Sequence, residues 1–248
     1  EDGYFNVKVS PSIVAPVDTV VRTAYAKDIL FEIEENKKFR LSSVKFHGNE
    51  SFSQRKLRKE LTNTKERKWW TFWVKSFDQE NLEEDIEALT DFYKNQGFRD
   101  FRVLSDTLNI DQSKSTLSLN LFLEEGPKYY YNNFSFEDNR IADKEELERA
   151  LNLKSGDIFS QEEFDKAVYE NMMSIYQDKG YIFSNVNAVI TPVGKDSLDI
   201  SFLFDEGNKV YINQIYVSGN DRTRENVIRR ELKIYPGDVF NRSKLMRS

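Results

Sequence analysis

The stretch that decides the fold reads Asp205-Glu-Gly-Asn-Lys-Val-Tyr-Ile-Asn-Gln-Ile-Tyr-Val-Ser-Gly-Asn220. Two earlier copies of it end at Asn139 and Asn49, so the spacings are 220 − 139 = 81 and 139 − 49 = 90 residues. Each copy runs from an acidic turn through a lysine and an alternating strand to a turn that ends in asparagine. A period of this size predicts a tandem array of small domains.

The composition bounds the class of protein. The chain has 248 residues, of which 39% are hydrophobic and 14% aromatic, enough for a core in each small repeat. Charged residues sum to a formal net charge of −6, whereas binding to nucleic acid calls for a basic face. No apolar run approaches the ~20 residues of a membrane helix, and we expect no signal peptide at Glu1. Because the chain opens and stops inside the repeated pattern, we expect it to be part of a longer protein.

The repeats divide the chain into four segments, called here the first to fourth repeats. They are the second half of a repeat at 1–36, complete repeats at 37–126 and 127–207, and the beginning of a further repeat at 208–248. A tryptophan-rich insertion at 64–75 explains why the first spacing is longer than the second. In the first repeat we expect a polar loop at 11–18, followed by an alternating strand at 25–34.

Each complete repeat is predicted to have the element order β-α-α-β-β. In the second repeat, Ser53 is expected to cap a short helix and Asp78 a longer one. Residues 101–110 and 115–124 then form a hairpin, with alternate leucines from Leu117 onward facing inward.

The third and fourth repeats follow the same order. Asp143 and Ser160 are each followed three residues later by a glutamate, which predicts a capping box at the start of both helices. In the fourth repeat a strand is expected through Ile215 and Val217. The predicted fold class is therefore α+β: tandem β-α-α-β-β repeats, each a three-stranded mixed sheet covered by two helices, arranged as an elongated rod.

Four short motifs recur in this order. They are the acidic turn Glu206-Gly-Asn-Lys-Val-Tyr211, the strand end Gly219-Asn220, the turns Gly156-Asp-Ile-Phe159 and Gly237-Asp-Val-Phe240, and the helix ends Tyr93-Lys-Asn-Gln-Gly-Phe98 and Tyr176-Gln-Asp-Lys-Gly-Tyr181. Over essentially the whole chain, the pattern resembles the POTRA domain, the polypeptide-transport-associated repeat. The sequence departs from the family at the tryptophan-rich insertion and at Asn36-Lys37, where the family's turn has a glycine.

The resemblance implies a function. Such tandems form the periplasmic arm of outer-membrane β-barrel assembly factors, and the implied partners are unfolded outer-membrane proteins, accessory assembly lipoproteins and the protein's own C-terminal transmembrane β-barrel. Clients add to the second strand of the sheet by β-augmentation, which uses main-chain hydrogen bonds. Carried over to this sequence, the candidate client residues are Phe101, Val103, Ser105 and Thr107 in the second repeat, and Asn185, Asn187, Val189 and Thr191 in the third.

Two alternatives stay open. One is the arm of a two-partner secretion transporter or of a translocation and assembly factor, which would serve a dedicated client. The other is a structural adaptor, like a division-protein repeat, that only docks partners.

No enzyme site is predicted. His47 is the only histidine and there is no cysteine, so histidine- and cysteine-based catalytic and metal sites are excluded or nearly so. The run Glu83-Glu84-Asp85 is interpreted as the solvated face of a helix. We therefore expect no catalytic, cofactor-binding or metal-binding residue, no cofactor and no nucleic-acid partner.

Two further features are singled out. Trp69, Trp70, Phe72 and Trp73 lie within five positions and either fill a seam of their own repeat or form an exposed partner patch. The short linkers between repeats predict hinges. The candidate hinge residues are Asn36, Gly126, Pro127 and Gly207.

Overall fold

The structure, a computed structural model, describes residues 8–14, 28–34, 40–64 and 79–248. The chain forms two compact units. The first comprises Glu1–Phe92 and Phe101–Glu125, and the second comprises Tyr93–Asp100 and Gly126–Ser248. The cap predicted at Asp78, the hinge at Asn36 and the tryptophan-rich segment with Trp69, Trp70, Phe72 and Trp73 lie outside the described residues.

The first repeat contributes an antiparallel hairpin of β1 (Lys8–Val14) and β2 (Asp28–Glu34). The polar loop expected at 11–18 is wrong in its first residues, because Pro11 lies inside β1 and pairs with Phe31. A proline is tolerated there because an edge strand does not need every amide for pairing. Ile29, Phe31 and Ile33 are all exposed, since no helix in the described part of the chain packs on this hairpin.

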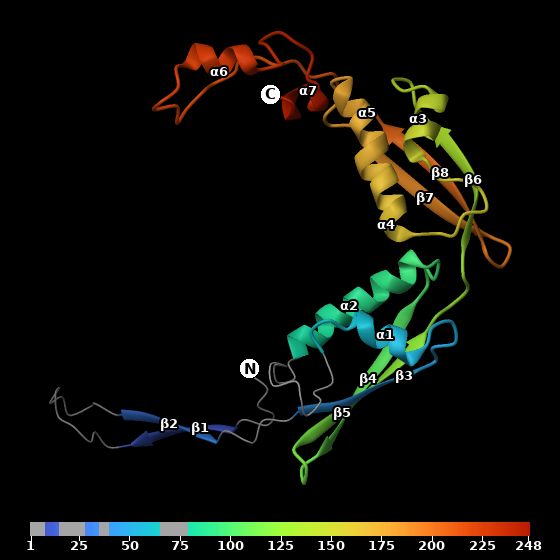
Figure 1. Cartoon of the computed structure of the whole chain (residues 1–248), viewed down its shortest axis with the longest axis vertical. Coiled ribbons are helices and arrows are strands. Elements are labelled where there is room, and N and C mark those ends of the chain that lie inside the picture. Colours follow the sequence, from blue (N-terminus) through green and yellow to red (C-terminus); the bar gives the residue numbers. More distant parts are fainter. Residues whose placement is uncertain (1–7, 15–27, 35–39, 65–78) are drawn as a thin grey trace. The chain divides into compact units, whose positions relative to one another are not determined.

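The second repeat forms a three-stranded mixed sheet. Its strands are β3 (Arg40–His47), β4 (Arg102–Asp111) and β5 (Thr116–Glu124), in the order β3-β5-β4. β5 is parallel to β3 and antiparallel to β4. The helices α1 (Gln54–Glu60) and α2 (Gln79–Asn95) lie on one face of this sheet (Figure 1). Alternate leucines of β5 are buried under them, as their spacing predicts.

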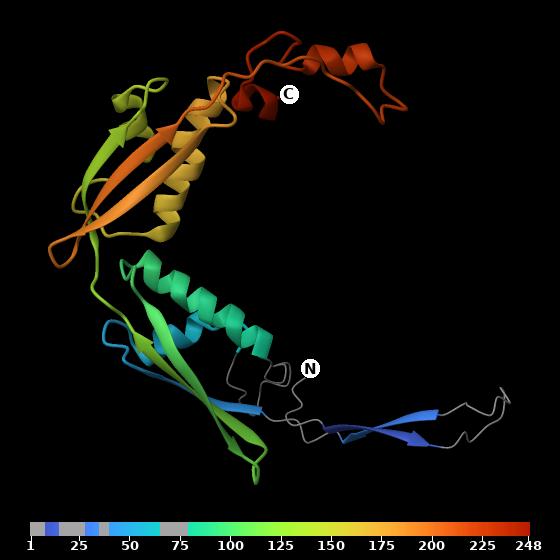
Figure 2. The ribbon, with the colours of Figure 1, turned by 180° about the vertical axis from the view of Figure 1, so that it is seen from behind.

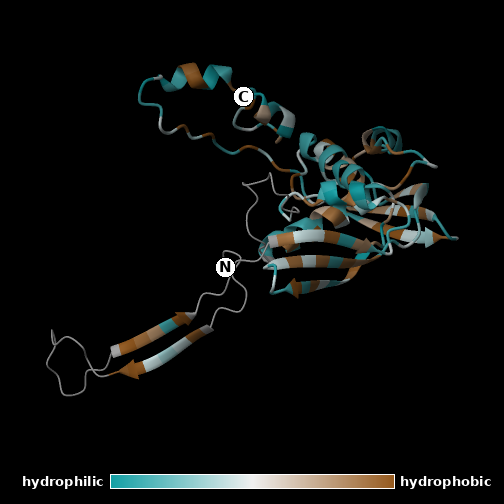
Figure 3. Ribbon diagram, turned by 60° about the horizontal axis from the view of Figure 1, so that its bottom comes forward, coloured by the Kyte–Doolittle hydropathy of each residue, from teal (hydrophilic) through white to brown (hydrophobic). Residues whose placement is uncertain are grey.

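The third repeat repeats this architecture. The strands β6 (Tyr130–Glu137), β7 (Asn185–Val193) and β8 (Ser197–Asp205) form a sheet in the order β6-β8-β7, again with one parallel and one antiparallel pair. The helices α3 (Lys144–Leu151), α4 (Gln161–Asp165) and α5 (Met173–Asp178) cover one face (Figure 1). Apolar and polar residues alternate along the strands (Figure 3), which gives the sheet one apolar face to bury.

An aromatic core joins the helices and sheet of the third repeat. Tyr131, Phe159, Phe164 and Phe202 are all buried. The Phe159 ring lies 5.5 Å from that of Tyr131 and 6.2 Å from that of Phe164, and the Phe164 ring lies 6.2 Å from that of Phe202. Such large side chains supply most of the apolar area that a small domain can bury.

A π-helical segment, η1 (Lys166–Met172), joins α4 to α5. The interval from the phenylalanine before the long helix to the glycine after it is 180 − 159 = 21 residues in the third repeat and 97 − 77 = 20 in the second. A π-turn accommodates one extra residue without changing the buried face on either side of it. The extra residue falls near Tyr169, which is 56% exposed.

The predicted caps are partly correct. Ser53 accepts the amide of Lys56 at the start of α1, and Ser160 accepts that of Glu163 at the start of α4. Neither predicted capping box is complete: the Asp143 side chain makes no cap hydrogen bond, and the Ser160 amide donates to the Tyr131 hydroxyl at 3.4 Å and not to Glu163. Glu146, the expected partner of Asp143, instead forms an ion pair with Lys179 at 2.5 Å, since α3 packs beside the C-terminal end of α5.

The fourth repeat contains the helices α6 (Glu225–Glu231) and α7 (Arg242–Met246). The strand expected through Ile215 and Val217 is not formed, and in this stretch only Tyr211 makes an isolated bridge, to Val239. In the two complete repeats, the strand beside the first strand is the third, and Tyr130 of β6 makes the counterpart of this isolated bridge, to Ile158. The described residues contain no third strand of the fourth repeat, so this segment has no partner.

Candidate functional site

Each sheet has an edge at its second strand. Within the described residues, β4 pairs only with β5, and β7 pairs only with β8. Seen from behind, the sheet of each complete repeat carries no helix on the opposite face (Figure 2). An edge strand presents unpaired N–H and C=O groups to any extended chain that approaches it.

The predicted residues of β4 do not share one face. Phe101 precedes the strand and is 4% exposed, so it belongs to the core. Val103 pairs with Leu123 and Ser105 with Phe122, which places a register shift at Leu104. A bulge of one residue switches the inward and outward positions beyond it. Val103 therefore faces the helices, whereas Ser105 and Thr107 face away from them.

Apolar side chains are exposed beside the bulge, on β4 and on its neighbour β5. Leu104 is 58% exposed. On the helix-free face, the ring of Phe122 stacks on His47 at 4.7 Å, and His47 Nε2 lies 3.3 Å from Asn120 Oδ1. His47 is thus a surface residue, as the sequence predicts. No cluster of metal-ligating side chains occurs among the residues that the structure describes.

The edge of β4 also carries charge. Arg102 Nε donates to Glu124 Oε2 at 2.6 Å, and this exposed hydrogen bond lowers the pKa of Glu124. Asp106 and Asp111 follow on the same strand. Charged residues on an edge disfavour the addition of another strand, because some of them would lose water on pairing.

The four predicted residues of β7 do share one face. Asn185, Asn187, Val189 and Thr191 are exposed, whereas Val186 between them is buried. The register of β7 with β8 has no shift, so the alternation runs unbroken from end to end. No residue of β7 is charged. Pro192 removes one amide near the end of β7. Of the two second-strand edges, β7 is therefore the flatter and the less charged.

The acidic turns after β5 and β8 close each complete repeat. The carboxylate of Glu125 accepts the amide of Ser51 at 3.0 Å and its hydroxyl at 2.6 Å. The carboxylate of Glu206 accepts the amides of Arg140 and Ile141, each at 2.7 Å. Sequence reasoning did not assign this role, although the same acid-glycine pair recurs 206 − 125 = 81 residues apart.

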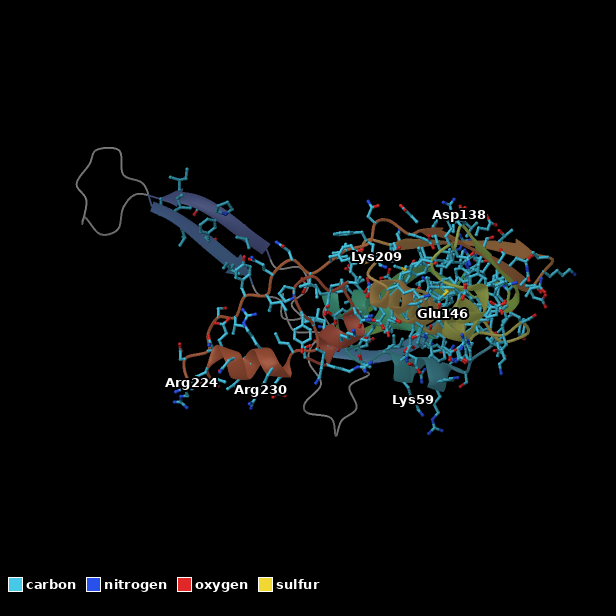
Figure 4. All side chains as sticks on the ribbon, turned by 90° about the horizontal axis from the view of Figure 1, so that it is seen from above. Lys59, Asp138, Glu146, Lys209, Arg224 and Arg230 are labelled. Atoms are coloured by element: carbon cyan, nitrogen blue, oxygen red, sulfur yellow. The ribbon has the colours of Figure 1, made fainter. Side chains whose placement is uncertain are left out.

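The predicted hinges lie at these turns. Gly126 and Gly207 have φ of +69° and +63°, a left-handed conformation that favours glycine, and Pro127 is exposed. Beyond the second turn, Val210 donates its amide to the carbonyl of Gly180 at 2.9 Å. Lys209, labelled in Figure 4, lies in this linker, with its Nζ 5.9 Å from the centre of the Tyr181 ring.

One carboxylate of the expected solvated run is buried. Asp85 is 1% exposed, whereas Glu83 and Glu84 on the same helix are exposed. Asp85 accepts the amides of Thr62 and Asn63 at 2.9 and 3.0 Å, and also that of Thr64. The interpretation of Asp85 as a solvated residue is therefore wrong. Asp85 binds the turn that follows α1. Its equivalent in the third repeat is Ala167, so a comparison of the repeats did not indicate this role.

Comparison with known proteins finds relatives across the chain. The model of the POTRA family, described as a surface antigen variable number repeat, matches residues 39–126, 129–207 and 210–248. The outer membrane protein assembly factor BamA of Neisseria meningitidis serogroup B is 28% identical over 249 residues, which cover 99% of this chain and 30% of that protein. A putative outer membrane protein assembly factor of Treponema pallidum is also 28% identical over 249 residues, covering 98% of this chain and 28% of that protein. The chain thus spans less than a third of these relatives.

Solved structures show the same fold. A crystal structure of Haemophilus influenzae BamA POTRA3-5 aligns with a TM-score of 0.63 at 22% identity, covering 84% of this chain and 82% of that one. BamA from Haemophilus ducreyi lacking POTRA domains 1-3 aligns with a TM-score of 0.53 at 19% identity, covering 68% and 30%. The predicted α+β fold of three-stranded mixed sheets covered by helices, and the resemblance, are confirmed. None of the helices in the described ranges is long and apolar enough to cross a bilayer.

Proposed function

The chain belongs to the POTRA family, and from this premise we propose that it is a non-enzymatic periplasmic scaffold of the machinery that assembles outer-membrane proteins. Two relatives that align with nearly all of this chain are named as outer membrane protein assembly factors. Those names favour assembly over the arm of a dedicated secretion transporter and over a purely structural adaptor. No cofactor and no bond chemistry enter the proposal.

The scaffold is proposed to hold unfolded β-barrel clients by β-augmentation at the second-strand edges. The observation that carries this proposal is β7, which is unpaired on its outer side within the described residues, uncharged and free of register shifts. A guest strand would bind through main-chain hydrogen bonds, which depend little on the guest's side chains. Such binding suits a machine that accepts many different clients.

The β4 edge is proposed as a weaker client site. Its bulge at Leu104 and its charged residues interrupt the ladder that a guest strand needs. Ser105 and Thr107 stay in the proposal as exposed residues of this edge, whereas Phe101 and Val103 support it from the core side. We further propose repeat boundaries at 37–126 and 127–207, docking of accessory lipoproteins on the array, and a partner patch at Trp69, Trp70, Phe72 and Trp73.

The proposal is tested by titrating the ¹⁵N-labelled chain with a peptide of alternating aromatic and polar residues at up to millimolar concentration. We expect amide shifts concentrated in β7 and cross-relaxation between peptide amides and Asn185–Val193. Val189→Lys places a charge on this edge, because Val189 is 44% exposed. It should weaken binding about fivefold, which corresponds to about 1 kcal/mol.

The matched control is Asn133→Lys, which adds the same charge to an exposed position of β6 at the opposite edge of the same sheet. It should leave peptide affinity unchanged. Equal weakening by both variants would mean that general electrostatics, and not the β7 edge, governs binding. Absence of any β7 shift with millimolar peptide would exclude augmentation at this strand.

A further inference from the structure

The start of helix α7 in the fourth repeat is capped from two sides. Asn241, the N-cap of this helix, accepts the amide of Lys244 at 2.7 Å. The preceding amide, that of Ser243, donates to Asp178 Oδ1 at 2.7 Å, and the Ser243 hydroxyl donates to Asp178 Oδ2 at 2.6 Å. Asp178 is the last residue of α5 in the third repeat. The first turn of a helix in one repeat is thus completed by a carboxylate from the repeat before it.

The same arrangement occurs once more within the second compact unit. Ser160 accepts the amide of Glu163 at 3.3 Å, and the preceding amide, that of Glu162, donates to Asn95 Oδ1 at 2.9 Å. Asn95 and Asp178 end corresponding helices, 178 − 95 = 83 residues apart. Two different side chains therefore make the same bond at equivalent positions.

Backbone bonds reinforce the junction between the third and fourth repeats. Val210 donates to the carbonyl of Gly180 at 2.9 Å, and Phe240 donates to the carbonyl of Val210 at 3.0 Å. Asn241 Nδ2 also donates to the carbonyl of Asp178 at 2.8 Å. A Cβ at Gly180 would overlap the Val239 side chain, so the two segments approach as closely as a glycine permits. The linker between these repeats, which contains Val210, is therefore hydrogen-bonded to both the third and the fourth repeat.

The physical reason for a cap at this place is general. The first amides of a helix have no acceptor within the helix, so an outside acceptor stabilises its start. A carboxylate there also interacts favourably with the positive end of the helix dipole. At α7 the third amide donates to the helix's own N-cap, whereas the second has a protein acceptor only while the third and fourth repeats stay docked.

We propose that Asp178 is a latch that couples the third repeat to the fourth and keeps the Gly207 hinge closed. The junction is then a two-state element, in which opening at Gly207 requires loss of the bonds from Ser243 and Asn241 to Asp178 and of the backbone bond from Val210 to Gly180. This inference concerns the mechanics of the array and stands independently of the client proposal. The hydrogen bond from the Glu162 amide to Asn95 Oδ1 indicates that a side-chain amide oxygen can accept at this position in place of a carboxylate.

The test uses the absence of cysteine from the chain. Lys195→Cys in the turn between β7 and β8 and Arg230→Cys on α6 are both at exposed positions and accept spin labels. Arg230 is labelled in Figure 4. The distance distribution between the labels is measured by double electron–electron resonance in the parent, in Asp178→Ala, in Asp178→Asn and in Glu170→Ala, a control at an exposed position in the same run of helices.

We expect a narrow distribution in the parent, Asp178→Asn and Glu170→Ala, and a broad one in Asp178→Ala. Hydrogen exchange of the Ser243 amide should accelerate at least about tenfold in Asp178→Ala, because local opening then exposes it. Protected amides at residues 198–204 report that the third repeat is still folded. A parent-like distribution in Asp178→Ala, or equal broadening in Asp178→Ala and Glu170→Ala, would overturn the latch.

Discussion

Replacing Asp85 by alanine tests whether a buried carboxylate holds the second repeat together. Asp85 accepts amides from three consecutive residues, Thr62, Asn63 and Thr64. Thr64 is buried, whereas Thr62 and Asn63 are exposed. Asp85→Ala therefore leaves the buried amide of Thr64 without this acceptor, whereas the amides of Thr62 and Asn63 can bind water.

The expected loss of stability follows from these environments. A buried donor left without an acceptor costs about 1–3 kcal/mol, and each bond whose donor regains water costs about 0.5–1 kcal/mol. Relief of the cost of burying the charge offsets part of this sum. We expect Asp85→Ala to lower the free energy of unfolding of the second repeat by about 3 kcal/mol, so that the repeat stays folded at a typical stability of about 5–15 kcal/mol.

The assay must resolve the repeats, because a chain of several domains has no single unfolding free energy. Native-state hydrogen exchange of core amides at residues 117–123 reports on the second repeat, and that of residues 198–204 on the third. A loss of about 3 kcal/mol corresponds to about 100-fold faster exchange at the first set. The second set should not change.

The control is Glu83→Ala, two residues earlier on the same helix, where the side chain is exposed. A surface substitution of this kind changes stability by about 0.5 kcal/mol or less. Equal exchange in Asp85→Ala and Glu83→Ala would refute the assignment of Asp85 as a structural acceptor. Faster exchange confined to residues 62–64 would show that this turn is not coupled to the core.

Two further predictions use contrasts within the third repeat. Gly180→Ala should weaken the junction with the fourth repeat by about 2 kcal/mol or more, because the added Cβ overlaps the Val239 side chain and φ is +96°. Gly156→Ala, with φ +88° and open space, should cost only about 1 kcal/mol. Faster hydrogen exchange of the Val210 amide in Gly180→Ala, but not in Gly156→Ala, is the expected result, and equal exchange would refute the close approach. Burial raises the pKa of Tyr131 above its ordinary value of about 10, so its contribution to stability is complete below that pH and declines as pH rises beyond it. Tyr131→Phe should flatten this decline in alkaline denaturation curves, and an unchanged decline would refute the assignment.

The sequence predicted those features that depend on spacing alone. The repeat period, the alternation that buries Leu117 and its neighbours, and the caps at Ser53 and Ser160 all follow from residues close together in the chain. The sequence also predicted that the edge residues of β7 share one face of the sheet, because their alternation is unbroken. In each case the physical cause is local: strand and helix geometry, or a hydroxyl three residues from an amide.

Other features needed the packed structure. The bulge at Leu104 is set by how β4 meets β5, so the strand's own sequence did not indicate that Phe101 and Val103 lie on the core side. Asp85 looks like one more acid on a charged helix, until packing against the turn after α1 buries it. The failed strand at Ile215 and Val217 shows the same dependence, because a β-strand is stable only beside a partner.

Sequence by itself thus determined that this chain is a series of sheet-and-two-helix repeats, because side-chain periodicity and turn chemistry act over a few residues and are written directly in the order of amino acids. Only the tertiary structure decided which acids are structural and which second-strand edge has an unbroken register. It alone showed that Asp178 reaches the first turn of the next repeat's helix. Those outcomes depend on contacts between residues about 20 to 80 positions apart, and a contact at that separation is set by how whole elements pack.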